Sequence, residues 1–299
     1  MQGLLLLNKP SGITSFGAVA RIKRLAGEKR VGHTGTLDPM ATGVLPIFLG
    51  RATALSSYLL EADKRYIAEI KLGITTDTCD ITGNVISQKS VDVKAEKLDA
   101  VLGEFKGVIM QTPPMFSAIK QNGVRLYDIA RKGGTVDIPK RQVTVYSLEV
   151  ISPLSLDNTF KIDVKVSKGT YIRSLARDIG EALGCGATLT SLERTETSGF
   201  SVSDCIDLES LTEDNIGDYI VSEERAIPHI KELFVTPRQA ERFSNGGQLA
   251  FDRLGIDANF ADGELFRVKE KQKFIGIGYA DLKNSQIAIK CIINHNSKE

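Results

Sequence analysis

The sequence predicts an α+β protein: a mixed or antiparallel sheet with helices, followed by a small all-β domain. Strand-like and helix-like segments alternate through the first two thirds of the 299 residues, but without the regular strand–helix–strand period of a doubly wound fold. From Val235 on, short alternating segments such as 274–279 indicate a separate β unit. We therefore predict one domain over residues 1–233, with 201–233 as an acidic helical connector, and a second over 234–299.

The expected elements follow from hydrophobic spacing and turn residues. Leu4 to Leu7 is a short apolar run that ends in a cluster of turn-forming residues, which is typical of a strand. Ser15 is the expected cap of a helix that ends near Leu25, with Phe16 among its inward-facing residues. The remaining helices are expected at 51–60, 94–104, 126–131 and 172–183, and the remaining strands at 64–73, 141–151, 159–166 and 187–197.

One loop displays a single carboxylate. Residues 32–46 include three glycines, which can adopt backbone angles closed to other residues, and Pro39 pushes Asp38 toward an extended conformation. An Asp-Pro pair between glycines usually forms only a turn. Here the loop runs into the apolar residues 44–49, which must be buried, so the loop is tethered to a core. A carboxylate held at the edge of a core is a candidate nucleophile or base.

Two further residues stand out beside Asp38. Tyr66 lies near the start of the alternating strand predicted at 64–73. Arg173 is expected in the first turn of an amphipathic helix, where the helix dipole disfavours a cation, so another group should hold it there. A carboxylate would do so through charge-assisted hydrogen bonds, and an adjacent arginine would keep Asp38 ionised. Taken alone, such an arginine is more often an ordinary surface residue.

Composition and charge narrow the class of protein. The longest apolar run near the N-terminus is too short to span a membrane and lacks the features of a signal peptide, so we expect a cytoplasmic protein. Four scattered cysteines and three histidines argue against a disulfide framework or a metal site. The net charge is +1, but residues 20–30 and 119–141 are basic whereas 201–233 is acidic, which suits a nucleic-acid-binding face. Residues 27–34 lack the lysine of a phosphate-binding loop, which excludes a nucleotide hydrolase.

The loop around Asp38 resembles the active-site loop of the TruB family of tRNA pseudouridine synthases, in the order His-Thr-Gly-x-Leu-Asp-Pro-x-Ala-Thr-Gly. Other segments similar to the family occur in the family's order, and the similarity covers most of residues 3–200. Asn8, in place of an acidic residue common in the family, is a departure. The matching segments are residues 5–10, 33–43, 64–66, 76–78, 111–118 and 167–173.

The resemblance implies roles for individual residues. The family's catalytic carboxylate falls on Asp38, its stacking tyrosine on Tyr66 and its carboxylate partner on Arg173. The expected substrate-binding positions are His33, Tyr171, Leu192, Lys9 and Asp80.

The resemblance also implies a reaction and its partners. The family isomerises the uridine at position 55 in the T-stem-loop of tRNA by breaking the C1′–N1 bond and forming a C1′–C5 bond. The target base must leave its stack, and an aromatic side chain such as Tyr66 offsets that cost. No step moves electrons or phosphate, so neither a metal nor a cofactor is required. The C-terminal β domain resembles a PUA domain that would contact the acceptor arm, and a monomer is expected.

Several questions of mechanism and function stay open from the residues alone. Asp38 can attack the anomeric carbon or remove the 2′ proton, and Tyr66 or a water can be the base at C5. His33 can wedge into the RNA loop or make a structural hydrogen bond. A glycosidase would need a second acid, for which Asp80 is the nearest candidate, although its neighbours indicate a turn that supports the site. The chain could also be a non-catalytic RNA-binding protein of the same fold, or a guide-RNA-dependent synthase.

Overall fold

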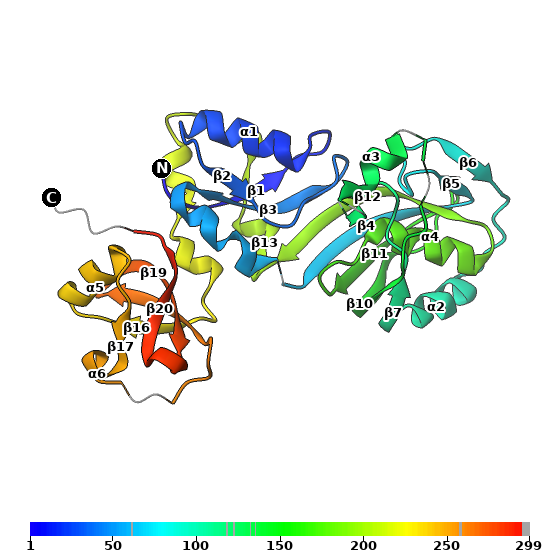
Figure 1. Cartoon of the computed structure of the whole chain (residues 1–299). Coiled ribbons are helices and arrows are strands. Elements are labelled where there is room, and N and C mark those ends of the chain that lie inside the picture. Colours follow the sequence, from blue (N-terminus) through cyan, green and yellow to red (C-terminus); the bar gives the residue numbers. More distant parts are fainter. Residues whose placement is uncertain are drawn as a thin grey trace.

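The structure is a computed structural model that describes residues 1–60, 62–117, 119–121, 123–131, 133–134, 136–256 and 259–294. Figure 1 shows a long twisted sheet with helices packed on it and a small curled sheet formed by the C-terminal part of the chain. In the described part of the fold, eleven strands form the first sheet and five form the second. The predicted α+β class is confirmed. No helix in the described ranges is long and apolar enough to cross a membrane.

The large sheet is mixed, with mostly antiparallel neighbours. Its strands are β1 Gly3–Lys9, β2 Val31–His33, β3 Thr42–Leu49, β4 Lys64–Leu72, β7 Gly107–Gln111, β10 Arg141–Ser152, β11 Thr159–Val166, β12 Ala187–Thr197, β13 Phe200–Ser201, β14 Ile206–Asp207 and β15 Ile220–Val221. The spatial order is β14–β1–β3–β12–β4–β11–β10–β7, while β15, β2 and β13 pair with β1, β3 and β12. The pairs β1–β14 and β3–β12 are parallel. All five strands predicted before residue 200 are present.

The four leucines of β1 are buried because the sheet is covered on both faces at this end. One alternating pair, Leu5 and Leu7, packs against α1 (Ser15–Leu25). The other pair packs against the 3-10 helix η1 (Gly50–Leu59) and the C-terminal unit. Since successive side chains of a strand point to opposite faces, a strand covered twice requires an uninterrupted apolar run.

Two helices cover the other half of the sheet. The inward residues of α4 (Ile172–Leu183), such as Leu175, are fully buried against β12 and β4, and Gly184 ends this helix in the left-handed conformation with a φ of 84°. α2 (Ala95–Glu104) packs against α4. Both predicted helices are confirmed. The short elements before α4 are β5 Ile74–Thr76, β6 Val85–Gln88, β8 Lys120–Gln121, β9 Val124–Arg125 and α3 Leu126–Arg131. Within the basic segment 119–141, the side chains of residues 120, 125, 131 and 132 lie outside the described part.

Details of the N-terminal region differ from the prediction. The cap of α1 is Thr14, whose Oγ1 accepts a hydrogen bond from the N of Gly17 at 2.9 Å, while Ser15 is buried. Phe16, expected on the inner face, is 77% exposed, because the buried stripe of the helix begins at Ser15 rather than at Phe16. The helix predicted at 51–60 is a 3-10 helix.

The acidic connector also differs from its expectation. It contains short 3-10 helices instead of a longer helix, and its strands β14 and β15 pair with β1, so this segment extends the large sheet. β16 (Lys231–Phe234) already belongs to the small sheet. The division of the chain at residue 233 stays a prediction. The 3-10 helices are η2 Val202–Asp204, η3 Leu208–Ser210, η4 Ile216–Tyr219 and η5 Glu223–Ala226.

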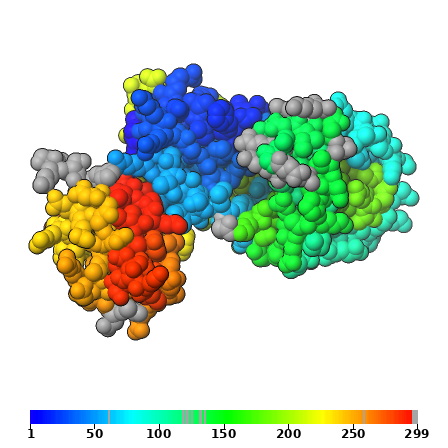
Figure 2. All heavy atoms as spheres, viewed as in Figure 1, coloured from blue at the N-terminus to red at the C-terminus, as the bar shows by residue number. Residues whose placement is uncertain are grey.

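The C-terminal unit is a PUA-like curled sheet, as predicted, and it also carries two short helices that the sequence did not indicate. The unpredicted helix α5 (Pro237–Ser244) begins with a capping box, in which Thr236 and Gln239 satisfy each other's backbone N–H groups. Figure 2 shows this unit packed beside the light-blue segment that contains η1. The sheet order is β16–β18–β19–β20–β17, and the remaining elements are β17 Leu249–Ala250, α6 Phe251–Leu254, β18 Leu265–Glu270, β19 Lys273–Asp281, η6 Leu282–Asn284 and β20 Gln286–Ile292.

Candidate active site

The loop between β2 and β3 presents Asp38 and is held on both sides of it. Ser15 fixes Leu37, the residue before Asp38. Its Oγ accepts a hydrogen bond from the N of Leu37 at 2.9 Å and donates one to the O of Leu37 at 3.0 Å. On the other side, the O of Pro39 accepts a hydrogen bond from the N of Gly12 at 2.8 Å. Asp38 therefore stands between two fixed residues, and the backbone aims its side chain.

Lys9 supports this loop from inside the protein. Its side chain is fully buried, and its ammonium group donates to the O of Pro10 and of Ile13, both at 2.8 Å, and of Pro39 at 3.3 Å. Burial lowers the pKa of Lys9 to about 8, although the charge of Asp38 opposes this shift. Because three backbone carbonyls accept from its ammonium group, Lys9 supports the loop, and a contact of Lys9 with substrate stays a prediction.

Arg173 makes the predicted contact with Asp38. Its Nη2 donates to Oδ1 of Asp38 at 3.0 Å, and its Nε lies 2.9 Å from Oδ2 as an ion pair without an aligned hydrogen bond. The same guanidinium donates to the O of Thr78 at 3.1 Å and of Phe116 at 2.9 Å. Only 5% of the Arg173 side chain is exposed. These contacts join three chain segments to the first turn of α4 and explain why a cation is tolerated there.

A second carboxylate, Asp80, also contacts Arg173. Its Oδ2 lies 3.4 Å from Nη1 of the arginine. Its Oδ1 accepts hydrogen bonds from the N of Thr82 at 3.0 Å and from Oγ1 of Thr78 at 2.8 Å. Asp38 and Asp80 thus share one arginine instead of facing each other across an open gap, which argues against a glycosidase with paired acids. Asp80 supports Arg173, and a role for Asp80 in binding substrate stays a prediction.

These surroundings raise the pKa of Asp38. Burial is the largest cause, the charge of Arg173 opposes it, and the charge of Asp80 adds to it. The Asp38 side chain is 34% exposed, so part of it stays open to solvent. Arg173 lowers the pKa of Asp38, as expected, but burial raises it by more. Asp38 therefore loses its proton at a higher pH than an ordinary aspartate does.

Tyr66 and Leu192 lie on the two central strands of the large sheet. Tyr66 on β4 is 8% exposed and pairs in register with Arg194 of β12, two residues after Leu192. Alternate residues of a strand share a face, so Leu192 and Arg194 point to the side on which Tyr66 lies. Tyr66 and Leu192 belong to the buried cluster that contains Leu37, the residue before Asp38. The structure therefore gathers the predicted aromatic and apolar residues around the base of the loop.

Tyr171 is held by a glutamine that the sequence patterns do not single out. Gln111 is fully buried; its Nε2 donates to the O of Tyr171 at 3.1 Å, and its Oε1 accepts from the N of Tyr171 at 2.8 Å. The guanidinium of Arg141 lies 6.0 Å from the centre of the Tyr171 ring. Gln111 belongs to a motif noted in the sequence, but no local signal shows its pairing with a residue so far along the chain.

His33 folds onto its own loop. Its Nε2 lies 3.2 Å from Oγ1 of Thr36, which is the structural hydrogen bond considered above. Burial, followed by the charge of Arg194, lowers the pKa of His33. The wedge that His33 would form in an RNA loop stays a prediction.

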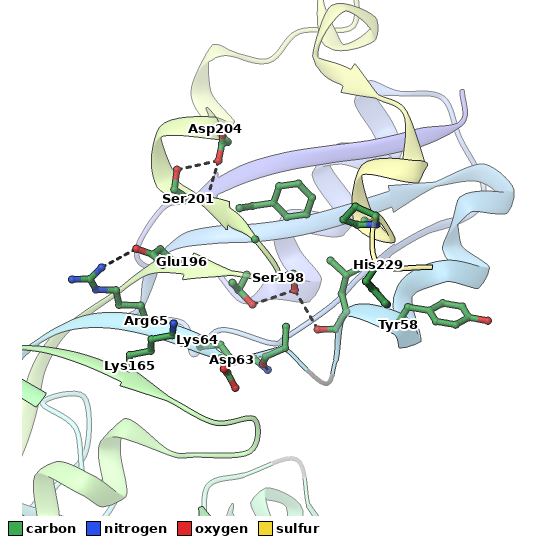
Figure 3. A pocket seen from close by; sticks show the side chains of 17 residues that line it. Tyr58, Asp63, Lys64, Arg65, Lys165, Glu196, Ser198, Ser201, Asp204 and His229 are labelled. Atoms are coloured by element: carbon green, nitrogen blue, oxygen red, sulfur yellow. Dashed lines mark hydrogen bonds and ion pairs between the residues drawn. The ribbon is translucent and has the colours of Figure 1, made fainter. Parts of the chain in front are cut away.

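A separate cavity of about 480 Å³ opens where β4 begins and β12 ends, as Figure 3 shows. Asp38 and Arg173 are not among its lining residues. Its labelled charged groups include existing pairs: Arg65 donates to Glu196 at 3.0 Å, and the carboxylate of Asp204 accepts from Ser201. Lys64, whose pKa burial lowers to about 8, is held there, but its ammonium group donates to the backbone O of Leu60 at 3.2 Å and of Ala62, so we place the candidate active site at Asp38.

Comparisons with known proteins agree with this geometry. Residues 23–172 match the family described as TruB family pseudouridylate synthase (N terminal domain), and residues 173–226 match the tRNA pseudouridylate synthase B C-terminal domain. The tRNA pseudouridine synthase B of Clostridium kluyveri is 43% identical over 279 residues, which cover 93% of this chain and 95% of that protein. The protein of the same name from Clostridium novyi is 41% identical over 291 residues, with 96% and 98% covered.

Two solved structures contain chains that share this fold. A chain in the crystal structure of a Cbf5-Nop10-Gar1 complex is 29% identical with a TM-score of 0.73, over 98% of this chain and 85% of that one. A chain in an H/ACA RNP bound to a substrate RNA containing 2′-deoxyuridine is 28% identical with a TM-score of 0.72, over 98% and 86%. Fold and site together define a pseudouridine synthase, which is an isomerase. The chain belongs to the TruB family.

Replacement of Asp80 with Asn is expected to move the pH profile of this enzyme. Without the Asp80 charge the pKa of Asp38 falls, so the acid limb of kcat/KM moves to lower pH. Arg173 also loses an anchor, and we expect kcat to fall about tenfold or more. The matched control is Asp77→Asn in the same turn, where the carboxylate accepts hydrogen bonds from Asn84 at the surface. An acid limb that stays in place for Asp80→Asn would contradict the coupling between the two carboxylates.

Proposed function

We propose that this chain converts the uridine at position 55, in the T-stem-loop of tRNA, into pseudouridine, with Asp38 as the catalytic carboxylate. The observation that carries the proposal is the ion pair of Asp38 with buried Arg173, on a loop fixed on both sides of Asp38. The names of the relatives, which this chain matches over nearly their full length, support tRNA as the substrate. The chain acts as a monomer in the cytoplasm.

Asp38 acts at the sugar of the target uridine. The C1′–N1 bond breaks as Asp38 either attacks C1′ or removes the 2′ proton. The detached base then turns until C5 faces C1′, and a C1′–C5 bond forms as Asp38 leaves C1′ or returns the proton to C2′. C5 loses its proton and N1 gains one, so the product is an isomer of the substrate and the atoms balance. Arg173 holds the Asp38 carboxylate in one orientation throughout.

The pocket must hold the detached base while it turns. Tyr66 provides an aromatic face for the flipped uracil, which offsets part of the cost of unstacking. Leu192 adds an apolar wall, and both side chains are nearly buried. This arrangement limits the water that could otherwise capture C1′ and release free uracil. The reaction moves neither electrons nor phosphate, and we propose that it needs no metal and no cofactor.

The experiment that tests the proposal uses the purified chain alone, with a chelator present. Two RNA fragments are compared, an unmodified T-stem-loop and an anticodon stem-loop of the same tRNA. We expect the T-stem-loop uridine to be converted in full without a guide RNA or a second protein, and the anticodon fragment to stay unchanged. Conversion that begins only when a guide RNA is added would contradict the proposal and favour a guide-dependent synthase. Binding without conversion would favour a non-catalytic RNA-binding protein.

A further inference from the structure

Arg194 is a buried cation that the mechanism above does not use. It lies in β12 and is 1% exposed. In the described part of the chain it forms no ion pair with a carboxylate, and its Nε and Nη2 donate to a backbone carbonyl. A charge taken out of water without an ionic partner is costly, and burial accordingly lowers the pKa of Arg194. The contacts of its guanidinium must therefore account for its presence.

One side of Arg194 holds the Asp38 loop. Its Nε and Nη2 both donate to the O of Val44, at 2.8 Å and 2.6 Å, just after the loop enters β3. At the start of the loop, a β carbon on Gly35 would lie 3.1 Å from Nη1 of Arg194. Gly35 has a φ of 69°, so glycine lets the loop pass close over the guanidinium. Arg194 thus lies against the loop on both sides of Asp38.

The other side of Arg194 faces Tyr66. The two residues are opposite each other in the antiparallel pair of β12 and β4. Tyr66 also opposes the effect of burial on the pKa of Arg194. In the parallel pair of β12 and β3, Arg194 is also opposite Gly43, where a β carbon would lie 2.2 Å from the carbonyl oxygen of Arg194. One residue therefore touches both the loop that carries Asp38 and the strand that carries Tyr66.

We propose that Arg194 is a positioning residue that fixes the Asp38 loop and Tyr66 relative to each other. This inference rests on the proposed function, in which Asp38 acts at the sugar while Tyr66 holds the base. The reaction needs Asp38 and Tyr66 at a fixed distance and orientation, because the base must turn between them. Arginine suits the task better than lysine, since its planar group can donate two hydrogen bonds to Val44 while its third nitrogen lies against Gly35.

The test compares the native enzyme with Arg194→Met and Arg194→Lys on unmodified tRNA. We expect kcat of Arg194→Met to fall about 100-fold with KM within about threefold, because a small misplacement of reacting groups costs rate more than affinity. Arg194→Lys keeps the charge but loses the paired hydrogen bonds, so its kcat should lie between that of the native enzyme and that of Arg194→Met. The matched control is Arg65→Met, which removes a guanidinium that pairs with Asp163 and Glu196 across the same central strands, and it should keep a near-native kcat.

A second readout follows the charge of Arg194. That charge lowers the pKa of His33, so the His33 pKa measured by NMR should rise in Arg194→Met and stay low in Arg194→Lys. A general loss of packing would not produce this pattern. Near-native kcat in Arg194→Met, or an equal loss in Arg65→Met, would overturn the proposal. If Arg194→Met does not fold, Arg194→Lys becomes the test, and an unchanged kcat in Arg194→Lys would overturn the proposal. An inactive native enzyme would instead refute the proposed function.

Discussion

Replacement of Asp38 with Asn is expected to abolish isomerisation while the protein stays folded and binds tRNA. Asparagine keeps the size of the side chain, but it can neither attack C1′ nor remove a proton. We expect kcat to fall by about 10⁴-fold or more, the scale on which enzymes lose rate when a group acting on the reacting bond is removed. The dissociation constant for tRNA, measured by filter binding, should stay within about threefold, because Asp38 contributes little binding surface.

The same variant also tests the electrostatics of the site. Because the pKa of Asp38 is raised in the folded state, the stability that this group contributes is present at low pH and is lost as pH rises through the raised pKa. Asp38→Asn should therefore unfold at the same temperature as the native protein or higher at pH 7, and the difference should shrink in acid. A variant that is less stable and binds tRNA weakly would make Asp38 a structural residue. Full activity would mean that another carboxylate acts.

Arg173→Lys is expected to have the second-largest effect. Lysine keeps the charge but cannot reach Asp38, Asp80 and two backbone carbonyls from one flexible ammonium group. We expect kcat to fall about 10²- to 10³-fold, the range for removal of a preorganised charged hydrogen-bond donor from an active site. Since Arg173 holds the Asp38 pKa down, a weaker contact moves the acid limb of kcat/KM to higher pH, opposite to the shift expected for Asp80→Asn.

The control for this variant is Arg177→Lys, one turn further along α4. Arg177 donates to the O of Thr112 at 3.1 Å and pairs with Asp178, so it shares the helix and the charge of Arg173 but does not contact Asp38. Near-native kcat in Arg177→Lys, together with a large loss in Arg173→Lys, separates the site from general damage to α4. Equal losses in both would show that the helix, rather than the contact with Asp38, limits the rate.

The sequence was informative where function depends on local patterns. The glycines and Pro39 around Asp38, the buried run after them and the helix that begins at Ile172 could all be recognised from spacing. The contact of Arg173 with a carboxylate could be inferred because a cation in the first turn of a helix needs a partner. The geometry confirms that contact, while the catalytic roles of Asp38, Tyr66 and Arg173 stay predictions until they are measured.

The sequence did not predict contacts that a residue makes with neighbours far away in the chain. Lys9 belongs to a motif for which we expect a substrate contact. In the structure its side chain is buried and its ammonium group donates to three backbone carbonyls, one of them of Pro39. Arg194 sits in a strand whose pattern does not distinguish a buried arginine from an exposed one, and its contacts come from β3 and β4. The exposure of Phe16 likewise depends on which face of α1 packs against the sheet. A shift of the buried stripe by one residue moves Phe16 from the inner face to the surface.

The most direct test of the account is tritium release from an unmodified tRNA transcript that carries 5-tritiated uridine throughout. Formation of the C1′–C5 bond expels the label from C5, so the purified enzyme should release about one equivalent per tRNA. A transcript with cytidine at position 55 should release none. Release of several equivalents, or equal release from both transcripts, would contradict a single target in the T-stem-loop. No release from a tRNA that is still bound would contradict the central claim that this site isomerises uridine.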